Sequence, residues 1–186
     1  MSPGNASPIV ISAFANERLR EWPCDRFRGL IDILLRETSF NIQLVGTRSQ
    51  RVRGNEIVRG FPADRVSNTC GTKSWAQLVR AVDQAPFVVA NNSGIAHLAA
   101  ARRKWTLCVF SSSHAFVEWM PRGPHVVVFE RIVSCGPCGI GGARCLNGRA
   151  CMVEMDPVIV YRRFEAIVRA QDPLDGFHVL ARANGV

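Results

Sequence analysis

A polar turn between an apolar segment and an alanine-rich segment is the part of the sequence best suited to bind a ligand. Phe87 to Ala90 is short, apolar and rich in valine, which predicts a buried strand. Asn91 to Gly94 then forms a polar turn, and the alanine-rich run that follows, with His97, predicts a helix. The first amides of such a helix lack intrahelical partners, so an anion such as a phosphate can dock there. Turns of this composition also serve simply to cap a helix, so residue type alone leaves both interpretations open.

Four of the seven cysteines form a second cluster that could do chemistry, with the spacing C-x2-C-x6-C-x5-C and glycines between them. Four thiolates suit a tetrahedral zinc ion, and iron in a four-sulfur site is the second choice. Free thiols are the alternative to a metal. A metal here would be structural, holding together a loop with few apolar residues. The four residues are Cys135, Cys138, Cys145 and Cys151.

Strands alternate with helices along the chain, which predicts an α/β fold with a Rossmann-like parallel sheet and helices on both faces. The polar segments after the strands should then meet at one edge of the sheet. Strands are expected at 8–14, 40–45, 66–70, 87–90, 105–110 and 126–129, the last being the final strand. Helices are expected at 24–36, at 75–85, in the stretch that ends near Gly60 and after Gly94.

Composition narrows the class of protein. The chain has 186 residues, of which 47% are hydrophobic, enough for one domain with a core. No apolar run approaches the roughly 20 residues that span a bilayer, and the N-terminus does not resemble a secretory signal, so we expect a cytoplasmic protein. The formal net charge is +8, and all but two of the 23 basic residues are arginines. A basic surface would favour peripheral contact with anionic lipids, such as those of the inner membrane.

Three stretches resemble glycosyltransferase family 9, the ADP-heptose:lipopolysaccharide heptosyltransferases. The first is FANERLREWPCDRF, from Phe14 to Phe27, which is similar to a small-residue loop with a basic residue, followed by Trp-Pro and a helix. The second is VGT with the polar residues after it, from Val45 to Gln50. The third is NNSGIAHLAAA, from Asn91 to Ala101, which is similar to the signature Asp-Ser/Thr-Gly-x-x-His-Leu. The resemblance extends over 8–170.

The resemblance implies two Rossmann-like domains facing a cleft, the GT-B arrangement, of which this chain would be the C-terminal, donor-binding half. It implies an ADP-heptose type of donor, no cofactor required for the chemistry, and lipopolysaccharide core or another glycan as acceptor. Arg20 stands where a basic residue neutralises the departing diphosphate, a role that suits a guanidinium. His97 is the second candidate catalytic residue. The candidate donor-binding residues, matched by position, are Asn16, Gln50, Asn92, Ser93 and Gly94.

Three positions depart from the family pattern. Phe14 replaces a glycine, Gln50 a carboxylate and Asn92 an aspartate. The two amides keep their capacity for hydrogen bonds but lose a negative charge. The N-terminal acceptor domain would supply the general base that an acceptor hydroxyl needs. We therefore expect the isolated chain to bind nucleotide weakly and to transfer nothing.

Two other functions stay open at this point. A non-catalytic nucleotide-sugar-binding module is favoured by Gln50 and Asn92, and a zinc-loop nucleic-acid binder by the net charge and the four cysteines. No specific nucleic-acid partner is expected, because the arginines are scattered and lack interleaved aromatic residues. The expected organisation is a disordered N-terminus (1–7), a nucleotide-sugar-binding domain (8–170) that contains the cysteine-rich loop (134–152), and a C-terminal tail (171–186).

Overall fold

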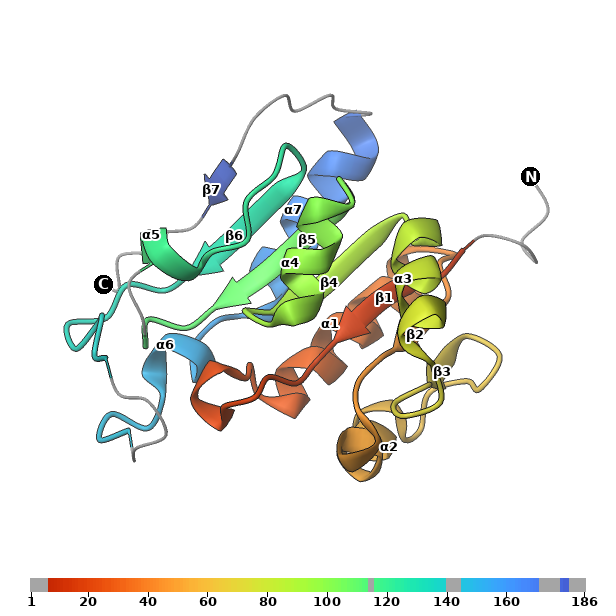
Figure 1. Cartoon of the computed structure of the whole chain (residues 1–186), viewed down its shortest axis with the longest axis horizontal. Coiled ribbons are helices and arrows are strands. Elements are labelled where there is room, and N and C mark those ends of the chain that lie inside the picture. Colours follow the sequence, from red (N-terminus) through yellow and green to blue (C-terminus); the bar gives the residue numbers. More distant parts are fainter. Residues whose placement is uncertain (1–6, 114–115, 140–144, 171–177, 181–186) are drawn as a thin grey trace.

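Seven parallel strands form one sheet in the order β3-β2-β1-β4-β5-β6-β7 (Figure 1). The computed structural model describes residues 7–113, 116–139, 145–170 and 178–180. The expected α/β fold with a parallel sheet is confirmed. The strands are β1 (Ile9–Ser12), β2 (Ile42–Leu44), β3 (Val66–Asn68), β4 (Phe87–Asn91), β5 (Trp105–Phe110), β6 (Val126–Glu130) and β7 (His178–Leu180).

Helices cover both faces of the sheet, and most of them connect one strand to the next (Figure 1). One face carries α1 and α7, which pack against each other, and the other face carries α3 and α4. The helices are α1 (Cys24–Glu37), α2 (Arg51–Val58), α3 (Trp75–Gln84), α4 (Gly94–Ala101), α5 (Phe116–Trp119), α6 (Ala150–Val153) and α7 (Pro157–Ala170), with short 3-10 turns η1 (Arg18–Arg20) and η2 (Arg48–Gln50).

The interior strand β1, which lies between β2 and β4, shows why the sequence folds into three layers. Its side chains alternate, so that Ile9 and Ile11 belong to the core under α1 and α7, while Val10 belongs to the core under α3 and α4. All three side chains are fully buried, as expected for a parallel strand that is covered on both faces. On α1, Phe27, Ile31 and neighbouring apolar residues complete the larger core.

The C-terminal part of the chain departs from the sequence-based expectation. Val126 to Phe129 is not the last strand, since β7 pairs with β6 in parallel. The helix α7, which contributes Phe164 and Ile167 to the core, was not predicted either. Apart from Ser7 and β7, the expected N-terminal segment (1–7) and tail (171–186) lie outside the described residues, and this division stays a prediction. Within the described residues, no helix combines the length and apolar character needed to cross a membrane.

Candidate functional site

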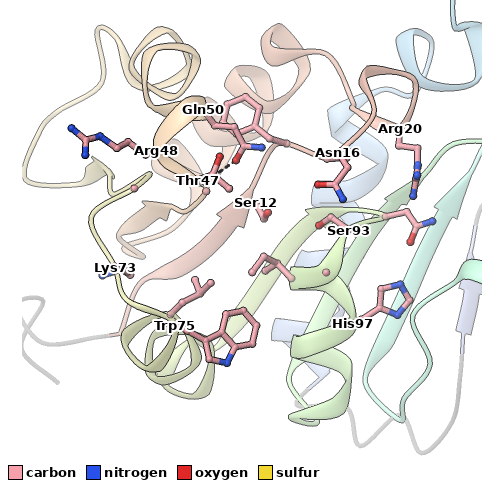
Figure 2. A pocket seen from close by; sticks show the side chains of 18 of the residues that line it. Ser12, Asn16, Arg20, Thr47, Arg48, Gln50, Lys73, Trp75, Ser93 and His97 are labelled. Atoms are coloured by element: carbon pink, nitrogen blue, oxygen red, sulfur yellow. Dashed lines mark hydrogen bonds between the residues drawn. The ribbon is translucent and has the colours of Figure 1, made fainter. Parts of the chain in front are cut away.

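A pocket of about 590 Å³ lies at the edge of the sheet where β1, β2 and β4 end (Figure 2). The segments after these strands and the first turns of α3 and α4 form its walls. Ligands of open parallel sheets bind at this edge, because loops and helix N-termini converge there. The lining residues are Ser12, Phe14, Ala15, Asn16, Arg20, Gly46, Thr47, Arg48, Gln50, Gly71, Lys73, Trp75, Leu78, Asn92, Ser93, Gly94, Ile95, His97 and Trp119.

The structure brings together every residue that the sequence singled out for the nucleotide-sugar site. Their individual roles stay predictions. The pocket also contains residues that sequence-based prediction did not name, among them Arg48, Lys73, Trp75 and Trp119. Arg48 and Lys73 follow β2 and β3, so the convergence of loops at one edge could have identified them. The seven predicted residues in the pocket are Asn16, Arg20, Gln50, Asn92, Ser93, Gly94 and His97.

A buried asparagine holds the segment after β1 in place. The Asn91 Oδ1 atom accepts a hydrogen bond of 2.8 Å from the Trp22 amide, and its Nδ2 donates one of 2.8 Å to the Ala13 carbonyl. Asn91 is the last residue of β4 rather than part of the polar turn, and its side chain is fully buried. It therefore joins the two ends of the loop that carries η1 to the end of the neighbouring strand.

An ion pair between a buried carboxylate and a half-buried arginine braces the same loop from the side of α2. The Glu21 carboxylate accepts a hydrogen bond of 3.2 Å from the Ala15 amide and pairs with Arg53. The hydrogen bond with Glu21 raises the pKa of Arg53. The Arg53 guanidinium also lies 4.6 Å from the ring centre of Phe14, the residue at a position where the sequence resemblance implies a glycine. Phe14 is thus a buried part of the pocket wall.

Two buried polar atoms in the pocket wall, Arg20 Nε and Ser93 Oγ, have no hydrogen-bond partner among the described residues. Arg20 is held on one side by Glu17, whose Oε1 lies 2.6 Å from Nη2. Ser93 precedes α4 as its N-cap residue, yet its hydroxyl makes no capping bond. An unpartnered buried polar group costs about 1–3 kcal/mol, which a ligand bound to it would recover.

His97 lies one turn into α4 and lines the same pocket (Figure 2). The alternative of a buried core histidine does not apply, because the residue as a whole is exposed. The pocket wall still desolvates the ring in part, which lowers the pKa of His97 below its ordinary value, and a hydrogen bond with the Trp119 backbone opposes this shift. The imidazole is therefore neutral at pH 7 in the free chain.

The loops after β2 and β3 form the opposite end of the pocket. Gln50 Oε1 accepts a hydrogen bond of 2.8 Å from the Thr47 amide, part of a capping box at η2 (Figure 2). Gly71 has a φ of 72°, and a Cβ there would lie 2.5 Å from Cα of Arg48. Only glycine allows the loop after β3 to lie this close to the loop after β2. A hydrogen bond of 2.9 Å from the Gly71 amide to the Gly46 carbonyl joins the two loops.

An arginine or lysine side chain lies at each end of the pocket. Figure 2 shows Arg20 and His97 at one end, and Arg48 and Lys73 at the other. None of the described residues that line the pocket is an aspartate or glutamate. Together with the N-terminus of α4, this arrangement suits an elongated anion with negative charge concentrated near Arg20.

The four clustered cysteines meet around a second, much smaller cavity of about 20 Å³, also lined by Leu19 of η1, Ser112 and Arg149. All are free thiols. Burial is the main cause that raises the pKa of Cys151, and the other three cysteines add to it. Within the described residues, no group of three or more His, Cys, Asp or Glu side chains is arranged so that it could hold a metal ion. The four cysteines therefore line one cavity, and the choice between a structural metal and free thiols stays a prediction.

Comparison with known proteins identifies the family. The sequence model of glycosyltransferase family 9 (heptosyltransferase) matches residues 4–142. No curated protein sequence matches the chain significantly. Three solved structures share its fold. E. coli ADP-heptose LPS heptosyltransferase II has a TM-score of 0.74 and 18% identity, and the match covers 89% of this chain and 48% of that one. E. coli heptosyltransferase WaaC with ADP has a TM-score of 0.71 and 18% identity, and the match covers 89% of this chain and 46% of that one. The iron-containing dodecameric glycosyltransferase TibC from enterotoxigenic E. coli has a TM-score of 0.69 and 14% identity, and the match covers 90% of this chain and 46% of that one.

The chain therefore spans about half the length of these structures. The family match covers well over half of the chain and includes the segments after β1, β2 and β4 that form the pocket. The fold, the site at the sheet edge and the sequence match agree, and this protein belongs to glycosyltransferase family 9, the heptosyltransferase family.

Proposed function

We propose that the chain is the donor-binding domain of a heptosyltransferase-like glycosyltransferase and that its large pocket binds an ADP-sugar. The observation that carries this proposal is the pair of unpartnered buried atoms, Arg20 Nε and Ser93 Oγ, in one pocket with the N-terminus of α4. A diphosphate can bond to the free helix amides, and to both atoms once the two side chains turn towards it. WaaC has been solved with ADP, and TibC with ADP-D-beta-D-heptose.

In this proposal the two ends of the pocket serve different parts of the donor. Negative charge develops on the departing ADP as the bond to the sugar breaks, and a cation fixed beside it lowers the barrier. Arg20 takes this role, with His97 and Asn92 on the sugar side. Gln50 lies where a ribose hydroxyl would bind, and its amide can still form a hydrogen bond to it.

The acceptor half of the reaction needs groups from outside this domain. An acceptor hydroxyl requires a proton acceptor within hydrogen-bond reach; no carboxylate lines the pocket among the described residues, and His97 is assigned to the donor in this proposal. We infer that a separate acceptor-binding domain supplies the base, and that lipopolysaccharide core or another glycan is the acceptor. A lipid-linked acceptor would place the reaction at the cytoplasmic face of the inner membrane, where the net charge of +8 favours peripheral contact.

Calorimetric titration of the purified chain with ADP-heptose, ADP and UDP tests the donor site. We expect both adenine nucleotides to bind, and Arg20→Ala and Ser93→Ala each to weaken binding about tenfold or more. Arg169→Ala is the matched control, because it removes an equal charge from an exposed ion pair with Glu165 on α7. Absence of adenine-nucleotide binding at millimolar concentration, or equal losses in the control, would refute the donor-site assignment.

A non-catalytic nucleotide-sugar-binding module is the second candidate function, and it is favoured by the amides at Gln50 and Asn92. The two candidates differ in one measurement. A donor domain should restore heptosyl transfer when combined with an acceptor domain of a family member, whereas a binding module should bind ADP-heptose without transfer under the same conditions.

We further propose that the four clustered cysteines bind a structural zinc or iron ion. They already surround one small cavity, and the Arg149 amide donates a hydrogen bond of 3.3 Å to Cys145 Sγ, a contact that would also stabilise a thiolate. TibC contains iron. Elemental analysis should find about one metal ion per chain, lost in Cys138→Ser and kept in Cys24→Ser, a control outside the cluster. A metal-free chain expressed with zinc and iron present would contradict the proposal.

A further inference from the structure

The short turn η1 is a wall shared by the two cavities. Leu19, in its middle, lines the small cavity among the four cysteines, while the next residue, Arg20, lines the large pocket. Two backbone hydrogen bonds hold the turn, from the Arg20 amide to the Glu17 carbonyl (3.0 Å) and from the Glu21 amide to the Arg18 carbonyl (3.2 Å). A displacement of this turn on the cysteine side must therefore move Arg20 as well.

Arg149 connects the cysteine cluster to this turn. Its Nη1 atom donates hydrogen bonds to the Arg18 carbonyl (2.8 Å) and to the Glu21 carbonyl (3.2 Å), which lie on either side of Arg20. Its own amide donates to Cys145 Sγ at 3.3 Å. One residue thus contacts the cysteine cluster through its main chain and both flanks of Arg20 through its side chain.

The backbone conformation of Arg149 indicates that the arginine side chain has a role at this position that glycine could not fill. Its φ is 61°, in the left-handed region that glycine occupies without strain and other residues rarely adopt. Gly148, just before it, has a φ of 57°. Local geometry alone would favour a second glycine. An arginine held in a strained conformation is explained when its side chain does something that glycine cannot.

We infer that Arg149 is a positioning residue, which sets the place of Arg20 for the donor diphosphate and makes donor affinity depend on the state of the cysteine cluster. This inference rests on the proposed ADP-sugar site. Any change that shifts Cys145, such as metal binding or oxidation, would reach Arg20 through the Arg149 main chain and guanidinium. We call the two hydrogen bonds from Arg149 Nη1 the clamp. The clamp restrains the end of the pocket that is proposed to bind the diphosphate.

Arg149→Gly separates positioning from folding, because glycine suits the left-handed backbone while the two clamp bonds are lost. Arg103→Gly is the matched control. Arg103 is also a non-glycine residue with a left-handed φ, of 56°, but it follows the C-terminal end of α4, away from Ser93 and Gly94. Arg149→Lys should keep most of the wild-type ADP affinity, since an ammonium can donate hydrogen bonds to both carbonyls.

Calorimetry with ADP and AMP on the full chain provides the functional measurement. We expect Arg149→Gly to weaken ADP binding about tenfold and AMP binding less than twofold, with both nearly unchanged in Arg103→Gly. In an Arg20→Ala background, Arg149→Gly should have no further effect on ADP affinity. Equal losses for ADP and AMP, or additive losses in the double variant, would overturn the inference.

Amide hydrogen exchange gives a measurement that needs no nucleotide. The Arg20 and Glu21 amides should exchange at least tenfold faster in Arg149→Gly than in Arg103→Gly, because the clamp no longer restrains η1. Unchanged exchange at these two amides would refute the positioning role even where ADP binds. Failure of the wild-type chain to bind ADP would instead refute the donor site, and the exchange result would still decide whether Arg149 holds the turn.

Discussion

Asn91 and Trp22 are separated by 69 positions, yet the side-chain oxygen of the first accepts a hydrogen bond of 2.8 Å from the amide of the second. The contact attaches the loop after β1 to the end of β4, and it lies out of reach of solvent. The loop that carries Arg20 is therefore positioned from a neighbouring strand rather than by its own sequence.

Asn91→Ala should destabilise the fold by about 3 kcal/mol. The substitution leaves the Trp22 amide and the Ala13 carbonyl without partners in a buried environment, each at a cost of about 1–3 kcal/mol. Urea unfolding measures the loss. Asn55→Ala, which removes a single exposed hydrogen bond to Asn68, should cost less than about 1 kcal/mol. Similar losses in the two variants would show that Asn91 does not brace the loop.

Gln50→Glu should strengthen ADP binding roughly fivefold, since a carboxylate is a better acceptor for ribose hydroxyls than an amide. The fold should be unaffected, because the new carboxylate can accept the same hydrogen bond from the Thr47 amide. Gln77→Glu is the matched control: Gln77 forms an equivalent capping box with Ser74 but does not line the pocket. Equal calorimetric affinities for wild type and Gln50→Glu would place the ribose elsewhere.

Gly94→Ala should impair nucleotide binding without harming the fold. A Cβ at this position would meet no atom of the chain within 4 Å, and alanine is the better helix former by up to about 1 kcal/mol. The added methyl group would occupy the space through which an anion approaches the first amides of α4. We expect an unchanged or higher melting temperature and an ADP affinity at least tenfold lower. Unchanged affinity would exclude the helix N-terminus from the site.

Binding of ADP should take up a proton at His97. Partial burial lowers the pKa of this histidine below 6.5 in the free chain, so it is neutral at pH 7. A diphosphate nearby favours the charged form and raises that pKa, so affinity should increase as pH falls from about 7 towards 6. Calorimetry in buffers of different ionisation enthalpy measures the uptake. His97→Gln should lose the proton uptake that comes from the imidazole, and identical net proton exchange in both proteins would contradict the prediction.

The sequence predicted the general form of the site better than the contacts that build it. Alternating strands and helices indicate a parallel sheet, and such a sheet brings the loops with Arg20, Gln50 and Ser93 to one edge whatever their detailed shape. An asparagine at the end of a strand looks the same in sequence as one in a turn. The bond between Asn91 and Trp22, and the stacking of Arg53 on Phe14, depend on segments that meet only in the folded chain.

The C-terminal strand β7 was missed for a different reason. β7 has only three residues, too few for an alternating pattern to stand out, and its place beside β6 is determined by pairing rather than by composition. The cysteine spacing suggested a structural metal, with free thiols as the alternative, and in the structure the four cysteines line one cavity. Spacing alone does not determine whether the sulfur atoms reach the distances that a metal requires.

The four tryptophans of the chain differ in exposure, with Trp105 half-buried on β5 outside the pocket, and the other three give the protein a built-in optical signal. Trp75 and Trp119, which line the pocket, are 66% and 50% exposed, whereas Trp22 is 1% exposed in the core. A ligand that fills the pocket would displace water from the two outer indoles and leave the inner one unchanged. Tryptophan emission should therefore shift or be quenched in proportion to occupancy, so that binding can be followed without a label.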